Sequence, residues 1–202
     1  MYLAGGQLFS GPDLKTFLAE RLAALDRVIA ELGAADFAAP NMTGLPARLF
    51  LRFRMPETLL MADESYFVDE HDMTVAEAGL PSDGLPSDGG QAYPPDAILK
   101  SVTIAIPFQG DPVLLTHRPA VFSAHQPEAT VVGQELHIGF IAAAEEEWMI
   151  QHRFQQHIAL IERTLEVTQW QAMDFNAQLA DHILAKLQAR QTALGVTNSP
   201  NQ

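Results

Sequence analysis

The sequence contains residues that could ligate a metal, but their spacing does not form a metal site. There are seven histidines, and the closest helical pair, His152 and His157, is five residues apart. On a helix this spacing turns the two side chains about 140° from one another, whereas ligands four apart share a face. The most ligand-dense stretch, Asp69 to Asp72, lacks the glycine and the spacing of a calcium-binding loop. We therefore predict no metal site and no cofactor.

Nucleophilic catalysis has no signature either. The chain contains no cysteine, which excludes cysteine nucleophiles, disulfides, thiolate zinc sites and iron-sulfur clusters, and fits a reducing compartment. It also contains no Gly-x-Ser-x-Gly turn and no phosphate-binding glycine loop. We predict no catalytic residue and favour a non-enzymatic role. An active site assembled from distant residues remains the alternative.

Three arginines form the densest basic feature of the chain. Alternation of apolar and polar residues from Arg48 to Met55 predicts a strand, with Arg48, Arg52 and Arg54 on one face. Arginine forks bind phosphate and carboxylate groups bidentately. The three side chains are therefore candidate ligand-binding residues of a small-molecule or nucleotide sensor. A solvent-facing sheet surface near acidic segments is the alternative.

The negative charge of the chain is concentrated in one segment. The 202 residues carry 25 acidic and 12 basic side chains, a formal net charge of -13. Residues 56–96 hold ten of the acids and no lysine or arginine, so the rest of the chain sums to only -3. The overall charge disfavours direct binding to nucleic acid or to an anionic membrane, because both need a positive protein surface.

The acidic segment contains a tandem repeat. Gly79 to Asp83 is followed by the same five residue types from Gly84 to Asp88. Because such a repeat cannot bury apolar area, we expect a mobile insert over about 56–97, with the greatest mobility from 81 to 93. The insert interrupts a single domain spanning 1–194, and 195–202 reads as a disordered tail or linker. An acidic nucleic-acid mimic is a further possible role.

Apolar periodicity predicts an α+β fold. Apolar residues recur every three or four positions over 12–32, which indicates a helix that starts near Ser10 and Asp13 and stops at Gly33. Strands are expected from Ile98 to Phe108, from Val113 to Arg118, and over 130–141 with a turn at Gly133. We expect a small antiparallel sheet packed against the N-terminal helix and long C-terminal helices.

The C-terminal third is predicted to be helical. An apolar stripe extends from Trp148 to Leu187 without an intervening glycine or proline. One continuous helix and two packed helices are both possible. A single helix of about 50 residues would reach about 75 Å, beyond the diameter of a domain, so we expect the stripe to contact a partner. The predicted interface residues are Trp148, Phe154, Ile158, Ile161, Leu165, Asn176, Leu179 and Ile183.

Two short motifs in the second half resemble a pattern in bacterial proteins. The first is a Pro-Phe-x-Gly-Asp turn after a strand, at Pro107 to Asp111. The second is a Phe-Asn-x-x-Leu helix core, Phe175 to Leu179, with a trailing Arg190. On these motifs, residues 98–194 resemble an uncharacterised region that adjoins effector domains in multidomain bacterial conflict (defence) proteins. The resemblance implies a regulatory position beside an effector and supplies no catalytic residue.

The leading functional hypothesis is an interaction or regulatory module. Its long C-terminal helices would pair with a second copy, giving a homo-oligomer, or with a partner domain. No basic signal region is evident at the N-terminus, and no apolar stretch of about 18 residues is free of charge. We therefore expect a cytoplasmic protein without a membrane anchor.

Overall fold

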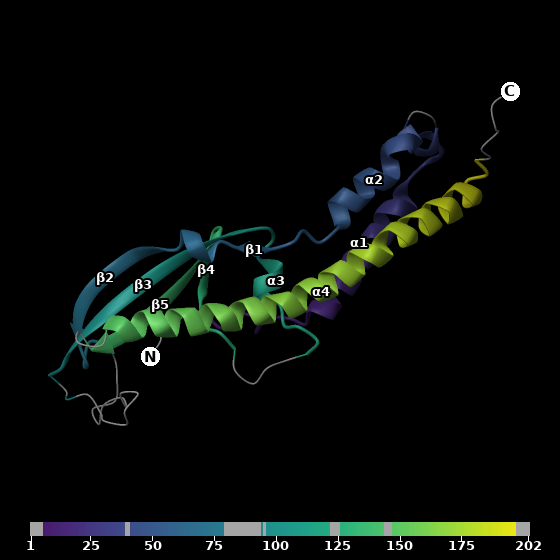
Figure 1. Ribbon diagram of the computed structural model, residues 1–202. Coiled ribbons are helices and arrows are strands. Elements are labelled where there is room, and N and C mark those ends of the chain that lie inside the picture. Colours follow the sequence, from purple (N-terminus) through teal and green to yellow (C-terminus); the bar gives the residue numbers. More distant parts are fainter. Residues whose placement is uncertain are drawn as a thin grey trace.

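The computed structural model describes residues 6–38, 41–78, 94, 96–121, 126–143 and 147–196. The molecule is elongated, with a sheet at one end, helices at the other, and α4 extending through both (Figure 1). Its helices and strands, in chain order, are α1 (Leu14–Glu31), the 3-10 helix η1 (Ala34–Phe37), α2 (Asn41–Phe53), β1 (Leu59–Leu60), the 3-10 helix η2 (Ala62–Glu64), β2 (Tyr66–Thr74), β3 (Ile98–Gln109), α3 (Val113–Thr116), β4 (Thr130–Val132), β5 (Glu135–Ala143) and α4 (Glu147–Ala193).

The sheet has five antiparallel strands, which confirms the predicted α+β class. Its central strand β3 pairs with β1 and β2 along one edge and with β5 along the other. Strand β4 pairs with the outer edge of β5. Alternate residues of β3, from Val102 to Phe108, are buried against the first half of α4, as the alternation in the sequence predicted. The predicted turn at Gly133 is also confirmed, with φ at +62° between β4 and β5.

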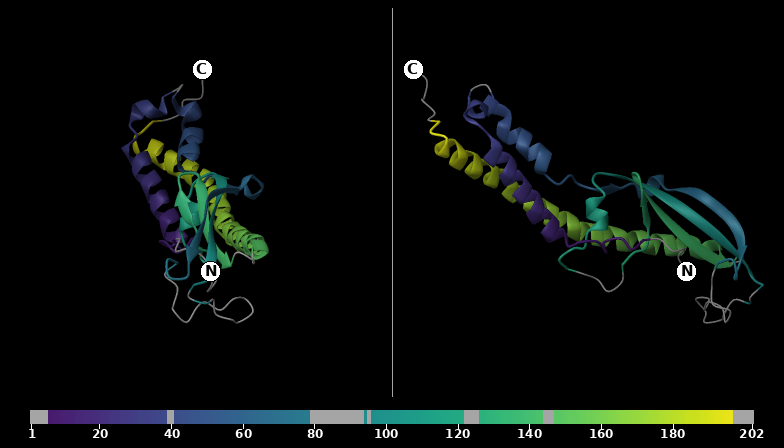
Figure 2. Two further views of the ribbon diagram at one scale, coloured as in Figure 1. Left: turned by 90° about the vertical axis from the view of Figure 1, so that its left-hand side faces the viewer. Right: turned by 180° about the vertical axis from the view of Figure 1, so that it is seen from behind.

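The opposite end is a bundle of three helices. Its core consists of apolar residues that recur at helical spacing on each helix, together with Phe37 of η1: Leu25, Ile29, Leu45, Leu49, Phe53, Leu179, Ile183 and Leu187. Figure 2 shows α1 and α2 on α4 from behind. We call this end the helical lobe and the other end the sheet lobe.

Helix α4 is one continuous helix of 47 residues. At 1.5 Å per residue it is about 70 Å long, which no single small core could cover. Its buried stripe is shared between the lobes: the part from Ile150 to Ala172 packs on the sheet core and the part from Leu179 to Leu187 on the helical core. Helix α4 can therefore be longer than the diameter of a domain and still have one side buried along most of its length, because two cores cover it in turn.

Side chains from one helix bond to the end of another in the helical lobe. Arg21 of α1 donates to the carbonyls of the last α2 residues, including Phe53 at 2.7 Å. Arg190 of α4 donates twice to the carbonyl of Leu32, at 2.9 and 2.8 Å, where α1 ends. Carbonyls at a helix end lack partners within the helix, so these guanidinium groups both satisfy them and complement the helix dipole.

An ion cluster joins α1 to α4. The Oδ1 atom of Asp26 lies 2.7 Å from Nε2 of His182, and its Oδ2 atom accepts a hydrogen bond from Nζ of Lys186 at 2.7 Å. Burial alone would raise the pKa of Asp26, but the bonds to Lys186 and His182 together lower it. Asp26 therefore stabilises the lobe above its ordinary pKa, and this contribution is lost as the pH falls through the lowered value.

His157 is a buried histidine at the contact between α4 and the sheet lobe. Its Nε2 atom donates to the carbonyl of Glu128 at 2.8 Å, and its ring meets Phe140 edge-on. Burial lowers the pKa of His157, with Glu128 opposing that shift. The neutral ring is therefore the form that the fold accommodates.

The free energy of unfolding is expected to fall as the pH is lowered below about 6.5, because His157 is buried in its neutral form. The unfolded chain binds a proton at the ordinary histidine pKa of about 6.5, while the folded chain does so only at lower pH. Stability should be constant with respect to His157 above about pH 6.5 and decline below it, by at most about 1.4 kcal/mol per pH unit. Urea titrations of the protein and of His157→Gln at pH 8 to 5 measure the difference. An equal slope in the two proteins would contradict the expectation.

Two predicted strands are helices in the structure. Residues 41–53 form α2, because Leu45, Leu49 and Phe53 are four apart and fit one buried helical face better than the alternation fits a strand. Residues 113–116 form α3, which begins after Pro112, and the Oδ1 atom of Asp111 accepts from the Val113 amide at 3.0 Å. Both corrections concern short segments in which apolar positions satisfy either period.

The start of α1 also differs in detail. Asp13 is the N-cap, and its side chain accepts from the amide of Thr16 at 3.1 Å. Ser10, which we expected to take part, donates instead to the carbonyl of Gln7 at 2.6 Å. The predicted helix itself is confirmed, with Leu14–Glu31 as its bounds.

The acidic segment is partly folded into the sheet. Within the predicted insert of 56–97, residues 59–74 supply β1, η2 and β2. Strand β2 takes part because Tyr66 to Thr74 can pair along the edge of β3, even though most of its side chains stay exposed. The tandem repeat and the expected mobility of 81–93 lie outside the described residues, as does most of the predicted tail. Among the described helices, none is both long and apolar enough to span a bilayer.

Candidate docking surface along helix α4

An exposed row of apolar side chains follows the second half of α4. Trp170, Met173 and Leu184 are 62, 59 and 55% exposed, and Ala177 and Ala180 between them are exposed as well. The five residues are spaced alternately by three and four, the pattern with which one helix packs along another. We call Trp170, Met173, Ala177, Ala180 and Leu184 the α4 seam.

The α4 seam is separate from the face that packs inside the chain. At 3.6 residues per turn it lies about 100° around the axis from the buried row of Ala172, Leu179, Ile183 and Leu187. A helix with two apolar rows at this separation can contact two neighbours at once. Ala172 already packs in the sheet core and the other three on α1 and α2, so the seam is the row left for a further contact.

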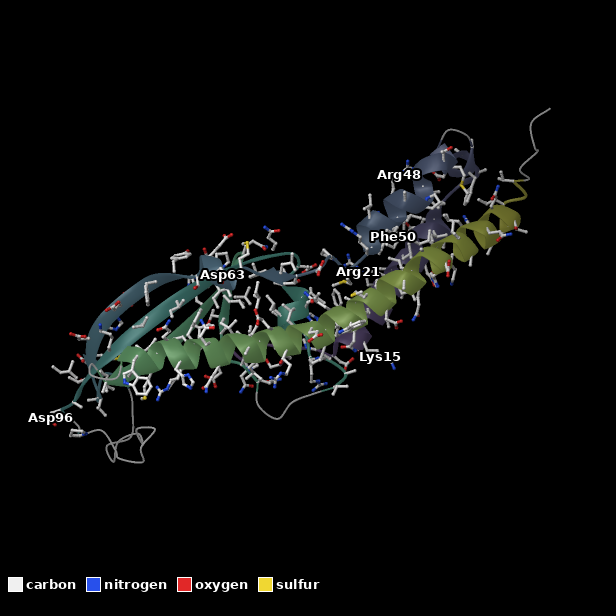
Figure 3. The ribbon with its side chains drawn as sticks, in the orientation of Figure 1. Lys15, Arg21, Arg48, Phe50, Asp63 and Asp96 are labelled. Carbon is white, nitrogen blue, oxygen red and sulfur yellow. The ribbon has the colours of Figure 1, made fainter. Side chains whose placement is uncertain are left out.

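A hollow lies beside the seam, between α2 and α4. We call it the α2–α4 hollow, with a volume of about 210 Å³, lined by Pro46, Ala47, Phe50, Ala180, Ile183 and Leu184. Figure 3 labels Phe50 on α2. All of its lining side chains are apolar, and the space accepts roughly one large apolar side chain. The hollow therefore extends the α4 seam sideways onto α2.

A second hollow lies where the chain passes from α2 to β1. This linker hollow has a volume of about 320 Å³ and is lined by Arg54, Met55, Pro56, Glu57, Leu114, Gln169, Ala172, Met173 and Asn176. Met173 belongs to the α4 seam, so the seam continues into this hollow. Arg54 and Glu57 give it one charge of each sign.

The linker beside this hollow is held to α4 by two amide side chains. Asn176 accepts from the Met55 amide and donates to the Met55 carbonyl, both at 2.8 Å. Gln169, seven residues earlier on α4, donates to the carbonyl of Thr58, whose hydroxyl donates to the carbonyl of Asp111 at 2.9 Å. The helix therefore fixes the chain at the point where it passes from one lobe to the other.

The same flank of α4 continues into the sheet lobe. Between β2, β3 and the start of α4 lies a third hollow of about 430 Å³, the β2–α4 hollow, lined by Ser65, Tyr66, Phe67, Glu70, Val102, Ile104, Trp148, Ile150, Gln151, Phe154 and Gln155. Trp148 at its rim is 69% exposed. Glu70 is bound to Lys100 at 2.8 Å, so the charge at this site is balanced within the chain.

The three candidate arginines do not share the strand face that was predicted for them. Arg48 and Arg52 lie one turn apart on α2, and Figure 3 shows Arg48 and Phe50 on different sides of that helix. The guanidinium of Arg52 lies 5.3 Å from the centre of the Phe53 ring, while Arg54 follows the helix and lines the linker hollow. The predicted common face required a strand, and the helical period separates Arg54 from the other two.

Seven of the eight predicted interface residues make contacts within the chain. Six of them are at most 8% exposed and belong to the two cores: Phe154, Ile158, Ile161, Leu165, Leu179 and Ile183. Asn176 is bonded to the linker, which leaves Trp148 as the exposed member. The prediction that these seven residues face a partner is wrong, because they pack within the chain. Helix α4 has two apolar rows, and the sequence does not indicate which of them is buried in the chain's own core. The row that it missed, the α4 seam, carries the same spacing.

A polar cluster lies on the face of the sheet away from α4. Glu135 accepts from the Tyr66 hydroxyl at 2.6 Å, and its other oxygen lies 3.0 Å from Nε2 of His137. These bonds lower the pKa of Glu135, and the one from Tyr66 raises the pKa of that tyrosine. Among the described residues, no group of three or more acids and histidines could hold a metal ion. The cluster links strand residues of β2 and β5 to one another.

No protein-family model, curated protein or solved structure matches this chain. The surface of the molecule is therefore the remaining guide to its function, and the α4 seam is an exposed apolar row on that surface.

Proposed function

We propose that the chain is a non-enzymatic interaction module that docks a helix along the α4 seam. The observation that carries the proposal is the exposed row of Trp170, Met173, Ala177, Ala180 and Leu184 beside the α2–α4 hollow. Three helices already surround the core of the helical lobe, and a fourth helix on the seam would complete a four-helix bundle.

The composition of the α4 seam suits this role. Large side chains at its two ends each contribute about 1.5 to 3 kcal/mol when an apolar contact buries them. The two alanines between them allow the backbone of a second helix to approach closely. Tryptophan, methionine and other large apolar residues in such a cluster are typical of protein interfaces. The docked helix belongs either to a second copy of the chain or to a partner domain.

Acidic substitutions in the seam should abolish docking without unfolding the chain. Met173→Glu with Leu184→Glu places two charges in the contact but only on exposed positions of the monomer. We expect at least a hundredfold weaker association, because two unpaired charges would be buried. Analytical ultracentrifugation measures the chain alone, up to high concentration, and with a leucine-rich amphipathic peptide of about three heptads.

The matched control places the same charges elsewhere on α4. Ala189→Glu with Ala193→Glu changes two exposed positions on another side of the helix. This variant should associate like the original chain, and circular dichroism should show both variants folded. Association that survives in the seam variant, or that is absent in the original chain in both experiments, would contradict the proposal.

A further inference from the structure

Acidic side chains lie beside the α4 seam. Asp174 and Asp181 are exposed and seven residues apart, so they lie on one flank of the seam, two turns from each other. From Thr164 to Leu184, α4 contains no lysine or arginine. Glu166, four residues before Trp170, adds an acid beyond the N-terminal end of the seam. The seam is therefore apolar along its centre and acidic along one edge.

On the C-terminal side of the seam, the nearest basic residues of α4 are engaged elsewhere, and on the N-terminal side Arg163 lies about three turns before Asp174. Lys186 is bound to Asp26 of α1 at 2.7 Å, and Arg190 donates to the carbonyl of Leu32. Asp174 accepts a hydrogen bond from Gln178 at 2.9 Å, an uncharged partner. Arg54 lies at the opposite, linker side of the seam, where Glu57 lines the same hollow. The acidic edge is thus not neutralised by α4 itself.

A second copy of the chain does not supply the missing charge. In an antiparallel two-fold pair centred on Ala177, Asp174 of one copy faces Asp181 of the other, and like charges at this position repel. In a parallel pair, the acidic edge faces the opposite edge of the other helix, where Gln169 and Asn176 are uncharged and already bonded to the linker. Neither arrangement gives an electrostatic gain.

We infer that the occupant of the α4 seam is a basic amphipathic helix from a different protein or domain. This inference rests on the proposed docking function. The helix carries an apolar row for the seam, lysine or arginine at seven-residue spacing toward Asp174 and Asp181, and one large apolar side chain for the α2–α4 hollow. The seam spans 15 residues, so the occupant needs about four helical turns.

Two peptides that differ only in charge test the inference. Both are about three heptads long with leucine in the apolar row, and the flanking positions carry lysine in one and glutamate in the other. We expect the intact chain to bind the lysine peptide about tenfold more tightly at low salt, the combined effect of two exposed ion pairs, with the difference shrinking at high salt. The affinities are measured by fluorescence anisotropy of labelled peptides.

Charge reversal separates a local effect from the net charge of the protein. Asp174→Lys with Asp181→Lys should reverse the preference to the glutamate peptide. Glu20→Lys with Glu31→Lys changes the net charge equally at exposed positions of α1 and should leave the preference for the lysine peptide intact. Equal reversal in both variants would overturn the inference, because it would reflect long-range attraction alone.

The outcomes distinguish this inference from the docking function itself. If the chain dimerises through the seam, or binds both peptides equally in a way that Met173→Glu with Leu184→Glu abolishes, docking stands and the basic partner is wrong. If the chain neither dimerises nor binds either peptide, both proposals fail. Selective, seam-dependent binding of the lysine peptide supports both.

Discussion

Replacing Gly110 with alanine is expected to cost about 4 kcal/mol of stability or to prevent folding. Gly110 has a φ of +106°, and a Cβ atom there would lie 2.1 Å from the carbonyl oxygen of Glu57 and 2.8 Å from the Cα of Thr58. Both atoms belong to backbone, which cannot rotate away as a side chain can. The backbone strain contributes roughly 1 to 2 kcal/mol and the overlap the remainder. Urea unfolding followed by circular dichroism measures the loss.

Gly133 provides the matched control for Gly110. It also has a positive φ, +62°, in the turn between β4 and β5, but a Cβ atom there would lie more than 4 Å from every residue other than its own chain neighbours. Gly133→Ala therefore carries only the backbone cost of about 1 kcal/mol. Similar losses for the two variants would show that the close crossing of the linker over Gly110 is not what requires a glycine.

The second large effect is expected at Asn176. Asn176→Ala removes both hydrogen bonds to the backbone of Met55, a residue only 2% exposed. Leaving a buried donor and a buried acceptor without partners costs about 3 kcal/mol in total. The loss is measured as the free energy of unfolding in urea. Because the linker joins the lobes at this point, hydrogen exchange at Met55 should rise in parallel.

A nearby position serves as the control for Asn176. Gln178→Ala removes an exposed side chain two residues away that bonds only to Asp174, and should change stability by at most about 0.5 kcal/mol. If Asn176→Ala cost no more than Gln178→Ala, the bonds between α4 and the linker would not be structural.

Long, strictly periodic segments were predictable from the sequence. Helix α1, the alternation in β3, the turn at Gly133 and the helical C-terminal third all follow from patterns repeated over many residues. Short segments were not, because a four-residue period and a two-residue period share positions such as Leu49 and Phe53, and only packing on α4 decides between them. The error in α2 then placed three arginines on a face that does not exist.

Contacts between distant residues left no local signal. Nothing near Asn176 in the sequence indicates that its amide meets Met55, 121 residues away, or that Arg190 reaches the end of α1. The position of the α4 seam also depends on contacts between residues that are far apart in the sequence. The sequence contains both apolar rows of α4, at equal spacing, and each could equally be core or interface.

By itself, the sequence determined the α+β class, the helical C-terminal third, the lack of cysteine chemistry and the concentration of acid in one segment, because these follow from composition and period. Only the tertiary structure decided which row of α4 is buried and whether α4 is one helix, because α1, α2 and the sheet cover one apolar row of α4 and leave the α4 seam exposed. Burial is a property of what packs against a side chain, and no residue carries that information alone.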